Sequence, residues 1–202
     1  MNLRKVLDFP LNQYYQSLYT KKGISLHHTC GSTAEGAISW WKQKDDRVGT
    51  AYIIDKDGTV HEVFNSNHWA YQFGFKNLVN RNEIEHSFIG IEIVNEGGLY
   101  KRNGKYYTDW NSEYKGEVKE QAWRDYKFWA TYSDAQYAAC AELIKMLSAK
   151  HKIEIKLNES IDFDLRVLKT HTVINHANVR MDKTDLSPAF DFGKLKTQLA
   201  LY

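Results

Sequence analysis

Two histidines and one aspartate have the side-chain types and positions that a metal site needs. His27 ends a short apolar run, His176 ends a later one, and Asp185 follows nine residues after His176. Functional sites in α/β sheets are usually built at strand ends. Two imidazoles and one carboxylate can hold a zinc ion and leave its fourth position for water. A histidine that is merely buried and hydrogen-bonded fits the same pattern, so these residues alone leave both interpretations open.

Glu92 is a second candidate for chemistry, because it is a lone carboxylate in the apolar run of residues 87–95. A charged group in such a run is costly to bury unless it is paired or hydrogen-bonded. An outward-facing side chain or a salt bridge would also explain it. Four other histidines stand among polar neighbours, and we expect them at the surface: His61, His68, His86 and His151.

The elements that must position these residues indicate an α/β domain with a central mixed sheet flanked by helices. Asp57-Gly58 is typical of a hairpin turn. Residues 87–95 suit a central strand that is buried on both faces. A helix capped by Ser32 or Thr33 is predicted as far as Trp41, and a second one begins at Ser133 or Asp134. Strands are predicted over residues 23–28, 50–54, 59–64, 87–95 and 170–176.

Residues 97–132 have a different character. They hold ten of the 28 aromatic residues, separated mostly by lysine, asparagine, glycine and acidic residues. We expect irregular loops here. Such loops could line a groove and stack on sugars or peptides, or they could cover a small core of their own.

Composition narrows the class of protein. The 202 residues suggest a single domain over residues 1–202 with a core of about residues 20–195, and we expect a monomer without a separate wall-binding domain. A net charge of +2 argues against a nucleic-acid binder. No run is long enough for a membrane span. Without a signal peptide, we expect synthesis in the cytoplasm. Cys30 and Cys140 are expected to be free thiols.

Four motifs in this sequence resemble those of the type 2 N-acetylmuramoyl-L-alanine amidases, a family that includes phage endolysins and peptidoglycan-recognition proteins. They occur in the family's order and extend over most of the chain. They are LHHT at 26–29, VGTAYIIDKDGTV at 48–60, SFIGIEIV at 87–94 and NHANVRMDKTDLSPAFDF at 175–192.

The resemblance implies a role for each matching residue. His27, His176 and Asp185 match the zinc ligands of the family. His28 would point to the other face of the strand, because side chains alternate along it. Glu92 matches a catalytic glutamate, and Lys183 matches a lysine that reaches over the metal.

The resemblance also implies an activity. A zinc amidase of this family would hydrolyse the amide between the lactyl group of N-acetylmuramic acid and L-alanine of the peptidoglycan stem. A phage endolysin that reaches the cell wall after release is the first expectation, and cell-wall recycling or an effector role are alternatives. A recognition module that binds peptidoglycan without cutting it, or a zinc peptidase that cuts within the stem, would be rivals.

Overall fold

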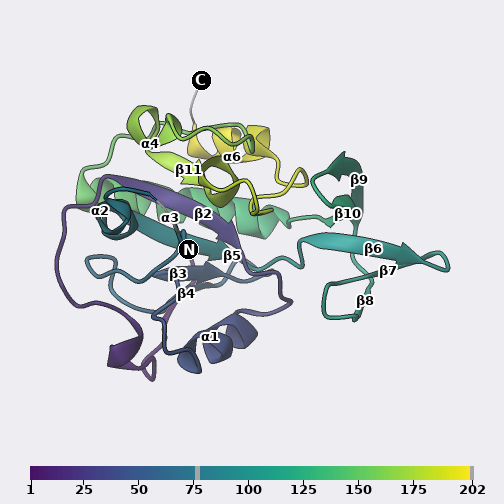
Figure 1. Ribbon diagram of the computed structural model, residues 1–202, viewed down its shortest axis with the longest axis horizontal. Helices are drawn as coiled ribbons and strands as arrows, with labels where there is room; N and C mark the ends of the chain where they lie inside the picture. Colours follow the sequence, from purple (N-terminus) through teal and green to yellow (C-terminus); the bar gives the residue numbers. More distant parts are fainter. Residues whose placement is uncertain (76–77, 201–202) are drawn as a thin grey trace.

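A six-stranded sheet forms the centre of the computed structural model, which describes residues 1–75 and 78–200 (Figure 1). Strands β2, β3, β5 and β11 run parallel where they pair, whereas β4 is antiparallel to β3, so the predicted mixed sheet is confirmed. In sheet order the strands are β1 (Leu3–Lys5), β4 (Val60–Glu62), β3 (Tyr52–Ile54), β5 (Phe88–Ile93), β2 (Gly23–His28) and β11 (Val173–Asn175).

Helices complete the α/β domain. The longest, α3, packs against β3 and α6. The bounds are α1 (Ala34–Lys42), α2 (Arg81–Ser87), α3 (Asp134–His151), α4 (Val167–Thr170), α5 (His176–Val179) and α6 (Phe192–Leu199), with a short 3₁₀ helix η1 at Leu11–Gln13. None of the helices in the described ranges combines the length and the apolar character that crossing a membrane requires.

The two predicted helices begin where their capping residues indicate. The Thr33 side chain accepts a hydrogen bond from the backbone N–H of Gly36 at the start of α1. At the start of α3, Ser133 and Gln136 form a reciprocal capping box. Each cap satisfies backbone N–H groups that have no partner inside the helix. The caps therefore explain why both helices start at these residues.

The predicted strand at residues 170–176 is too long. Only Val173–Asn175 is extended, Thr170 ends α4, and His176 is the first residue of α5. The Asn178 side chain accepts a hydrogen bond from the backbone N–H of Asn175, which turns the chain into the helix at this point. His176 consequently lies at a strand-to-helix junction.

The prediction of irregular loops after residue 97 is wrong. Residues 98–130, here called the arm, form a second, five-stranded sheet that extends from the main body (Figure 1). Asn103 and Gly104 both have positive φ and form the tight turn between its first two strands. In sheet order the strands are β8 (Glu113–Tyr114), β7 (Lys105–Tyr107), β6 (Gly98–Arg102), β10 (Tyr126–Ala130) and β9 (Val118–Trp123).

The aromatic residues of the arm divide between a core and a surface. Trp129 is fully buried and packs against Trp123 and Tyr126, with ring centroids 5.7 and 5.2 Å away. Trp110, in contrast, is exposed to solvent. The aromatic residues do not form a separate small core, because Trp129 belongs to the main hydrophobic core, whereas Trp110 remains free to contact a ligand.

Two other predictions have clear outcomes. The surface assignment is wrong for His61, which is buried, and His68, His86 and His151 are half-buried. His61 lies on β4 and is paired with Ile53 of the neighbouring strand β3. The expectation of free thiols is confirmed, since Cys30 and Cys140 form no disulfide.

Asn95 joins the arm to the central sheet. Its side-chain amide donates hydrogen bonds to the carbonyl oxygens of Ala130 (3.2 Å) and Thr131 (3.0 Å), at the end of the arm. Its side-chain oxygen accepts one from the N–H of Gly97 (2.7 Å), at the beginning of the arm. Asn95 is 1% exposed, so water cannot replace these partners. One side chain therefore fixes both ends of the arm.

We expect Asn95→Ala to lower the free energy of unfolding by about 2–4 kcal/mol, because three hydrogen bonds are lost and buried polar groups are left unpaired. The arm should also become sensitive to proteases at its two ends. Denaturant unfolding and limited proteolysis measure the two effects. The exposed Asn82→Ala serves as the control, and equal stability of both variants would contradict the role of Asn95.

Candidate metal centre and cleft

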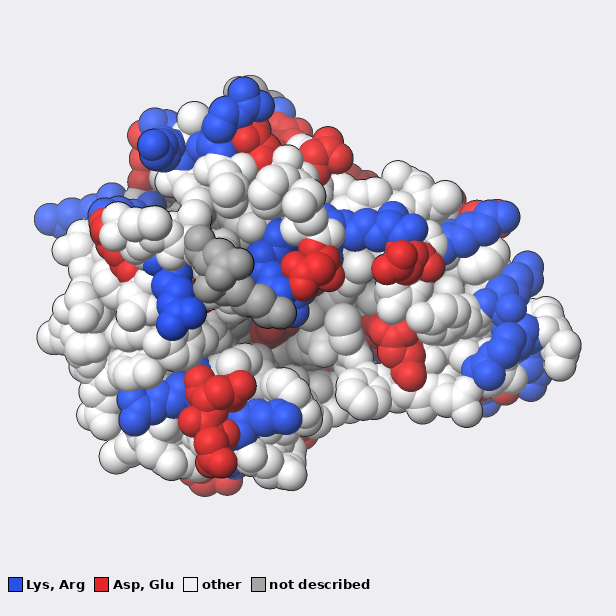
Figure 2. Space-filling model, in the orientation of Figure 1, with Lys and Arg blue, Asp and Glu red and all other residues white. Residues whose placement is uncertain are grey.

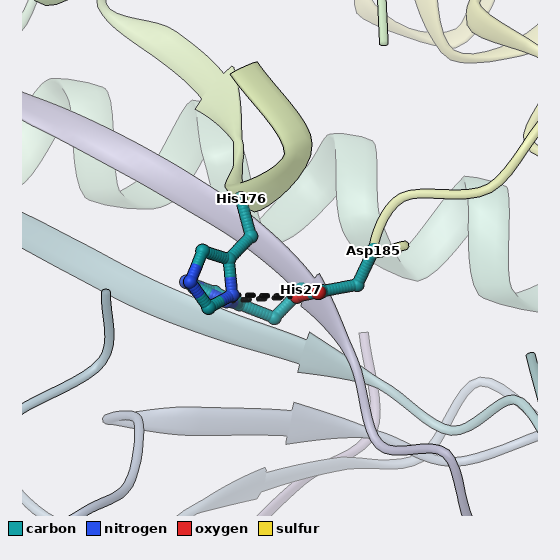
Figure 3. Close-up of side chains that lie close together, drawn as sticks. All are labelled: His27, His176 and Asp185. Atoms are coloured by element: carbon teal, nitrogen blue, oxygen red, sulfur yellow. Dashed lines mark hydrogen bonds and ion pairs between the residues drawn. The ribbon is translucent and has the colours of Figure 1, made fainter. Parts of the chain in front are cut away.

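His27, His176 and Asp185 converge on one point (Figure 3). The Nδ1 atoms of the two histidines lie 3.1 Å apart. Oδ2 of Asp185 lies 3.1 Å from Nδ1 of His27 and 2.9 Å from Nδ1 of His176. All three residues are buried, with exposed fractions between 2% and 7%. Three ligand atoms at nearly equal spacing can occupy three corners of a zinc tetrahedron.

The central sheet brings the three residues together. His27 is on β2, and β11 pairs with β2 so that Asn175 lies beside Leu26. The residues that follow this pair, His27 on β2 and His176 at the start of α5, therefore lie close together. The loop that follows α5 returns to this point, where the N–H of Ala177 donates to the carbonyl oxygen of Asp185 at 2.7 Å. Residues 158 positions apart in the sequence thus share one site.

The hydrogen bond between His176 and Phe73 determines which ring nitrogen is free. Nε2 of His176 lies 2.9 Å from the carbonyl oxygen of Phe73. A carbonyl only accepts hydrogen bonds, so Nε2 carries the proton. In neutral His176, Nδ1 then presents a lone pair toward Asp185. Such a partner for the second nitrogen is characteristic of metal-ligating histidines.

The three converging ligand atoms require a positive charge between them. Burial alone would raise the pKa of Asp185, but His176 and His27 hold it well below its usual range, so the carboxylate is ionised. Nδ1 of His176 lies 2.9 Å from this carboxylate, so either a second proton on the imidazole or a bound metal ion must lie between the two atoms. The donor set of two nitrogens and one oxygen fits zinc.

His28 points away from this site. Its Nδ1 lies 2.9 Å from the hydroxyl of Tyr132, on the opposite face of β2 from His27. Burial lowers the pKa of His28 to about 4, so this histidine is neutral near pH 7. The alternation of side chains along a strand accounts for the difference between the two neighbours.

The triad lies in a cleft of about 1290 Å³, between the main body and the arm. Figure 2 shows the surface hollowed near the centre of this face, with basic and acidic side chains interspersed around it. Trp40 of α1 and Trp110 of the arm both line the cleft. A cleft of this size exceeds that of most small-molecule pockets, so it can hold part of a polymer.

Glu92 lines the same cleft and pairs with His27 in the register of β5 and β2. Its Oε2 is buried and has no hydrogen-bond partner among the described residues. Burial raises the pKa of Glu92 to about 7, an effect that His27 and, to a smaller extent, Lys183 oppose. A carboxyl group with a pKa near neutrality can both accept and donate a proton, as a general base and acid must.

Lys183 lines the cleft two residues before Asp185 and is half-buried. Its backbone N–H donates to the carbonyl oxygen of Arg180 at 3.3 Å, in the loop that follows α5. The structure therefore places all five sequence-predicted site residues, His27, Glu92, His176, Lys183 and Asp185, around one cleft.

Comparison with known families adds a decisive observation. The sequence model of the N-acetylmuramoyl-L-alanine amidase family matches residues 18–188, which is most of the chain. The chain belongs to this amidase family. A comparison with curated protein sequences gives no match.

Several solved structures share the fold of this chain. The Escherichia coli amidase AmiD, in complex with its substrate, is 18% identical with a TM-score of 0.59, and covers 91% of this chain. This chain spans only 59% of AmiD. The match with the catalytic domain of XlyA (16% identical, TM-score 0.58) covers 98% of this chain and 99% of that domain. The match with the endolysin amidase LysCS of Clostridium intestinale (13% identical, TM-score 0.54) covers 100% of this chain and 97% of LysCS.

Trp40 and Trp110 line the cleft but were not predicted as site residues. Trp40 and Trp41 are adjacent on α1, yet Trp41 is 5% exposed and Trp40 is 49% exposed. Adjacent helical residues point in different directions, so only one of the pair can join the core. Trp110 carries no comparable signal, because its exposure depends on the fold of the arm.

The raised pKa of Glu92 predicts a pH-dependent stability of the metal-free amidase. An unfolded glutamate releases its proton near pH 4.5, whereas Glu92 in the folded chain retains it up to about pH 7. Between these values the folded state binds more protons, so the free energy of unfolding falls as pH rises. We expect the chelator-treated Glu92→Gln variant to gain roughly 2–3 kcal/mol relative to the wild type between pH 4.5 and 8.

Denaturant unfolding of both metal-free proteins at several pH values measures this difference. The metal ligands are the same in both proteins, so the difference between the two curves reports the Glu92 carboxyl together with its interactions with His27, Asp185 and Lys183. A difference that is constant with pH would contradict the raised pKa.

Proposed function

We propose that this chain is a zinc-dependent amidase that hydrolyses the amide between the lactyl group of N-acetylmuramic acid and L-alanine in peptidoglycan. The observation that carries the proposal is the buried triad of His27, His176 and Asp185, together with the Phe73 carbonyl that leaves Nδ1 of His176 free as a ligand. Membership of the amidase family supports the choice of bond. The substrate in the AmiD complex contains anhydro-N-acetylmuramic acid joined to L-alanine, which supports the same choice.

The triad would hold the zinc ion, and Glu92 and Lys183 would act on the substrate. When bound, the ion supplies Lewis-acid chemistry, which polarises the scissile carbonyl and lowers the pKa of water. Glu92 accepts the proton of the attacking water and then donates it to the departing amine of L-alanine. The ammonium group of Lys183 stabilises the negative charge that develops on the carbonyl oxygen, a contribution of roughly 3 kcal/mol for a well-placed donor.

We place this activity in an endolysin that acts on the bacterial cell wall after its release. LysCS, an endolysin whose solved structure shares the fold, supports this role. The partner of the chain is then the peptidoglycan polymer, and the size of the cleft is in keeping with such a substrate. A recycling enzyme would use the same chemistry on small soluble fragments, so activity on intact sacculi against soluble muropeptides separates the two roles.

The test is digestion of purified sacculi by the zinc-loaded protein, with and without a chelator, followed by mass spectrometry. We expect intact glycan strands and stem peptides that begin with free L-alanine, lost on chelation and restored by added zinc. New amines at other positions of the stem would indicate a peptidase. Sacculi that bind the protein but remain uncut would indicate a recognition module.

A further inference from the structure

Trp110 is an exposed aromatic ring with a fixed orientation. Its side chain is 72% exposed and lines the cleft. The indole N–H donates a hydrogen bond of 2.7 Å to the carbonyl oxygen of Cys30, two residues after the end of β2. Because the polar atom of the ring is already paired, the surface left for a ligand is flat and apolar. A ligand that stacks on this ring would remove apolar surface from water.

The turn that carries Trp110 is held from several sides. The N–H of Asn111 donates to the carbonyl oxygen of Thr108 at 2.9 Å, and the N–H of Thr108 donates to that of Ser112 at 3.0 Å. The hydroxyl of Tyr126 lies 2.9 Å from both carboxylate oxygens of Asp109. A ligand that stacks on Trp110 therefore meets a ring that has little freedom left to lose, which favours binding.

Trp40 presents a second aromatic ring to the cleft, from the main body. It belongs to α1 of the main body, is 49% exposed, and lines the same cleft as Trp110. The ammonium group of Lys44 lies 4.3 Å from the centre of the Trp40 ring and covers one of its two faces. The cleft thus has one exposed tryptophan from the main body and one from the arm.

The rest of the cleft lining indicates which part of a substrate these rings contact. Lys56 and Glu96 form an ion pair in the cleft, and Glu113 and Lys115 of the arm also line it. These charges suit the carboxylates and the amine of a stem peptide. The glycan, once its lactyl group is joined to the peptide, carries no charge, and its sugar rings present flat C–H faces. Such faces match an aromatic ring whose N–H is already used.

We propose that Trp110 and Trp40 form a subsite that stacks on sugar rings of the glycan strand, and so determine affinity for polymeric substrate. This inference rests on the proposed function, because it assigns the sugar part of that substrate to the two tryptophans. The charged part of the cleft then takes the stem peptide.

Binding to the Glu92→Gln protein, in which turnover is strongly reduced, tests this subsite. The two probes are a β-1,4-linked tetramer of N-acetylglucosamine and the tripeptide L-Ala-D-γ-Glu-L-Lys, each titrated by calorimetry. When Trp110→Ala is introduced into the Glu92→Gln protein, binding of the tetramer should weaken roughly tenfold, as expected for loss of a central aromatic contact. Binding of the tripeptide should change less than about twofold.

Two further variants keep the test decisive. Trp110→Phe retains a stacking ring without the N–H, so it should bind the tetramer more tightly than Trp110→Ala does. Phe163→Ala removes a ring that is 41% exposed but lies outside the cleft, and its tetramer affinity should match that of the parent. Weaker tripeptide binding with unchanged tetramer binding would overturn the assignment in favour of a stem-peptide contact. No change for either probe would remove the subsite altogether.

Hydrolysis separates this inference from the proposed function. If the zinc-loaded wild type cuts sacculi and Trp110→Ala has the same KM, the subsite fails while the amidase stands. If the wild type cuts nothing but binds the tetramer through Trp110, the amidase activity fails while the subsite stands.

Discussion

Glu92→Gln is expected to lower kcat on peptidoglycan by about 10²–10⁴-fold, the usual contribution of a positioned general acid–base. Glutamine keeps the size of the side chain but cannot take a proton from water near neutral pH. The pKa of about 7 that burial gives Glu92 is the property that the substitution removes. Because Glu92 is not one of the three converging ligands, the variant should bind as much zinc as the wild type.

Turnover of soluble muropeptides and metal analysis of the same samples measure these two effects. The control is Glu83→Gln, which removes an exposed carboxylate on α2 that pairs with Lys22. Its kcat should equal that of the wild type. A Glu92→Gln enzyme that keeps wild-type kcat would show that another group moves the proton.

His27→Ala should abolish zinc binding and hydrolysis, whereas His28→Ala should not release the metal. The two residues are neighbours on β2, but only His27 lies within 3.1 Å of Asp185 and His176. Loss of a direct ligand should reduce zinc affinity by more than the roughly 10–100-fold that follows loss of an outer partner.

His28→Ala is the matched control, because it removes the same side chain from the other face of one strand. It loses the hydrogen bond to Tyr132 and should cost about 1–3 kcal/mol of stability. Metal analysis after dialysis and denaturant unfolding distinguish the two variants. One zinc ion per chain in His27→Ala, with none in His28→Ala, would reverse the assignment of the ligand.

The strands and helices with strong local signals were predicted from the sequence. β2 is buried at every position and β5 at every position except Glu92, which is the pattern of parallel strands covered on both faces. Both predicted helices start at a residue that can cap a helix. These signals act within a few residues, so they do not depend on the rest of the fold.

The arm was not predicted, because its strands are short and half-exposed and mix aromatic with charged residues. The turn at Asn103-Gly104 was a usable signal, since this pair favours a two-residue hairpin. The N-terminal strand β1 and the short helix α4 carry weaker signals. Their positions depend on pairing with distant segments, such as β4 for β1.

For the site, the sequence by itself determined the residue types: two histidines, an aspartate, a glutamate in an apolar strand and a lysine, in motifs that resemble those of the amidases. The tertiary structure decided what they can do. The tautomer of His176 depends on a carbonyl 103 residues away, at Phe73. The pKa of Glu92 depends on burial by segments from the whole chain, and the exposure of Trp110 depends on the arm. These properties arise from contacts between distant residues, which only the folded chain brings together.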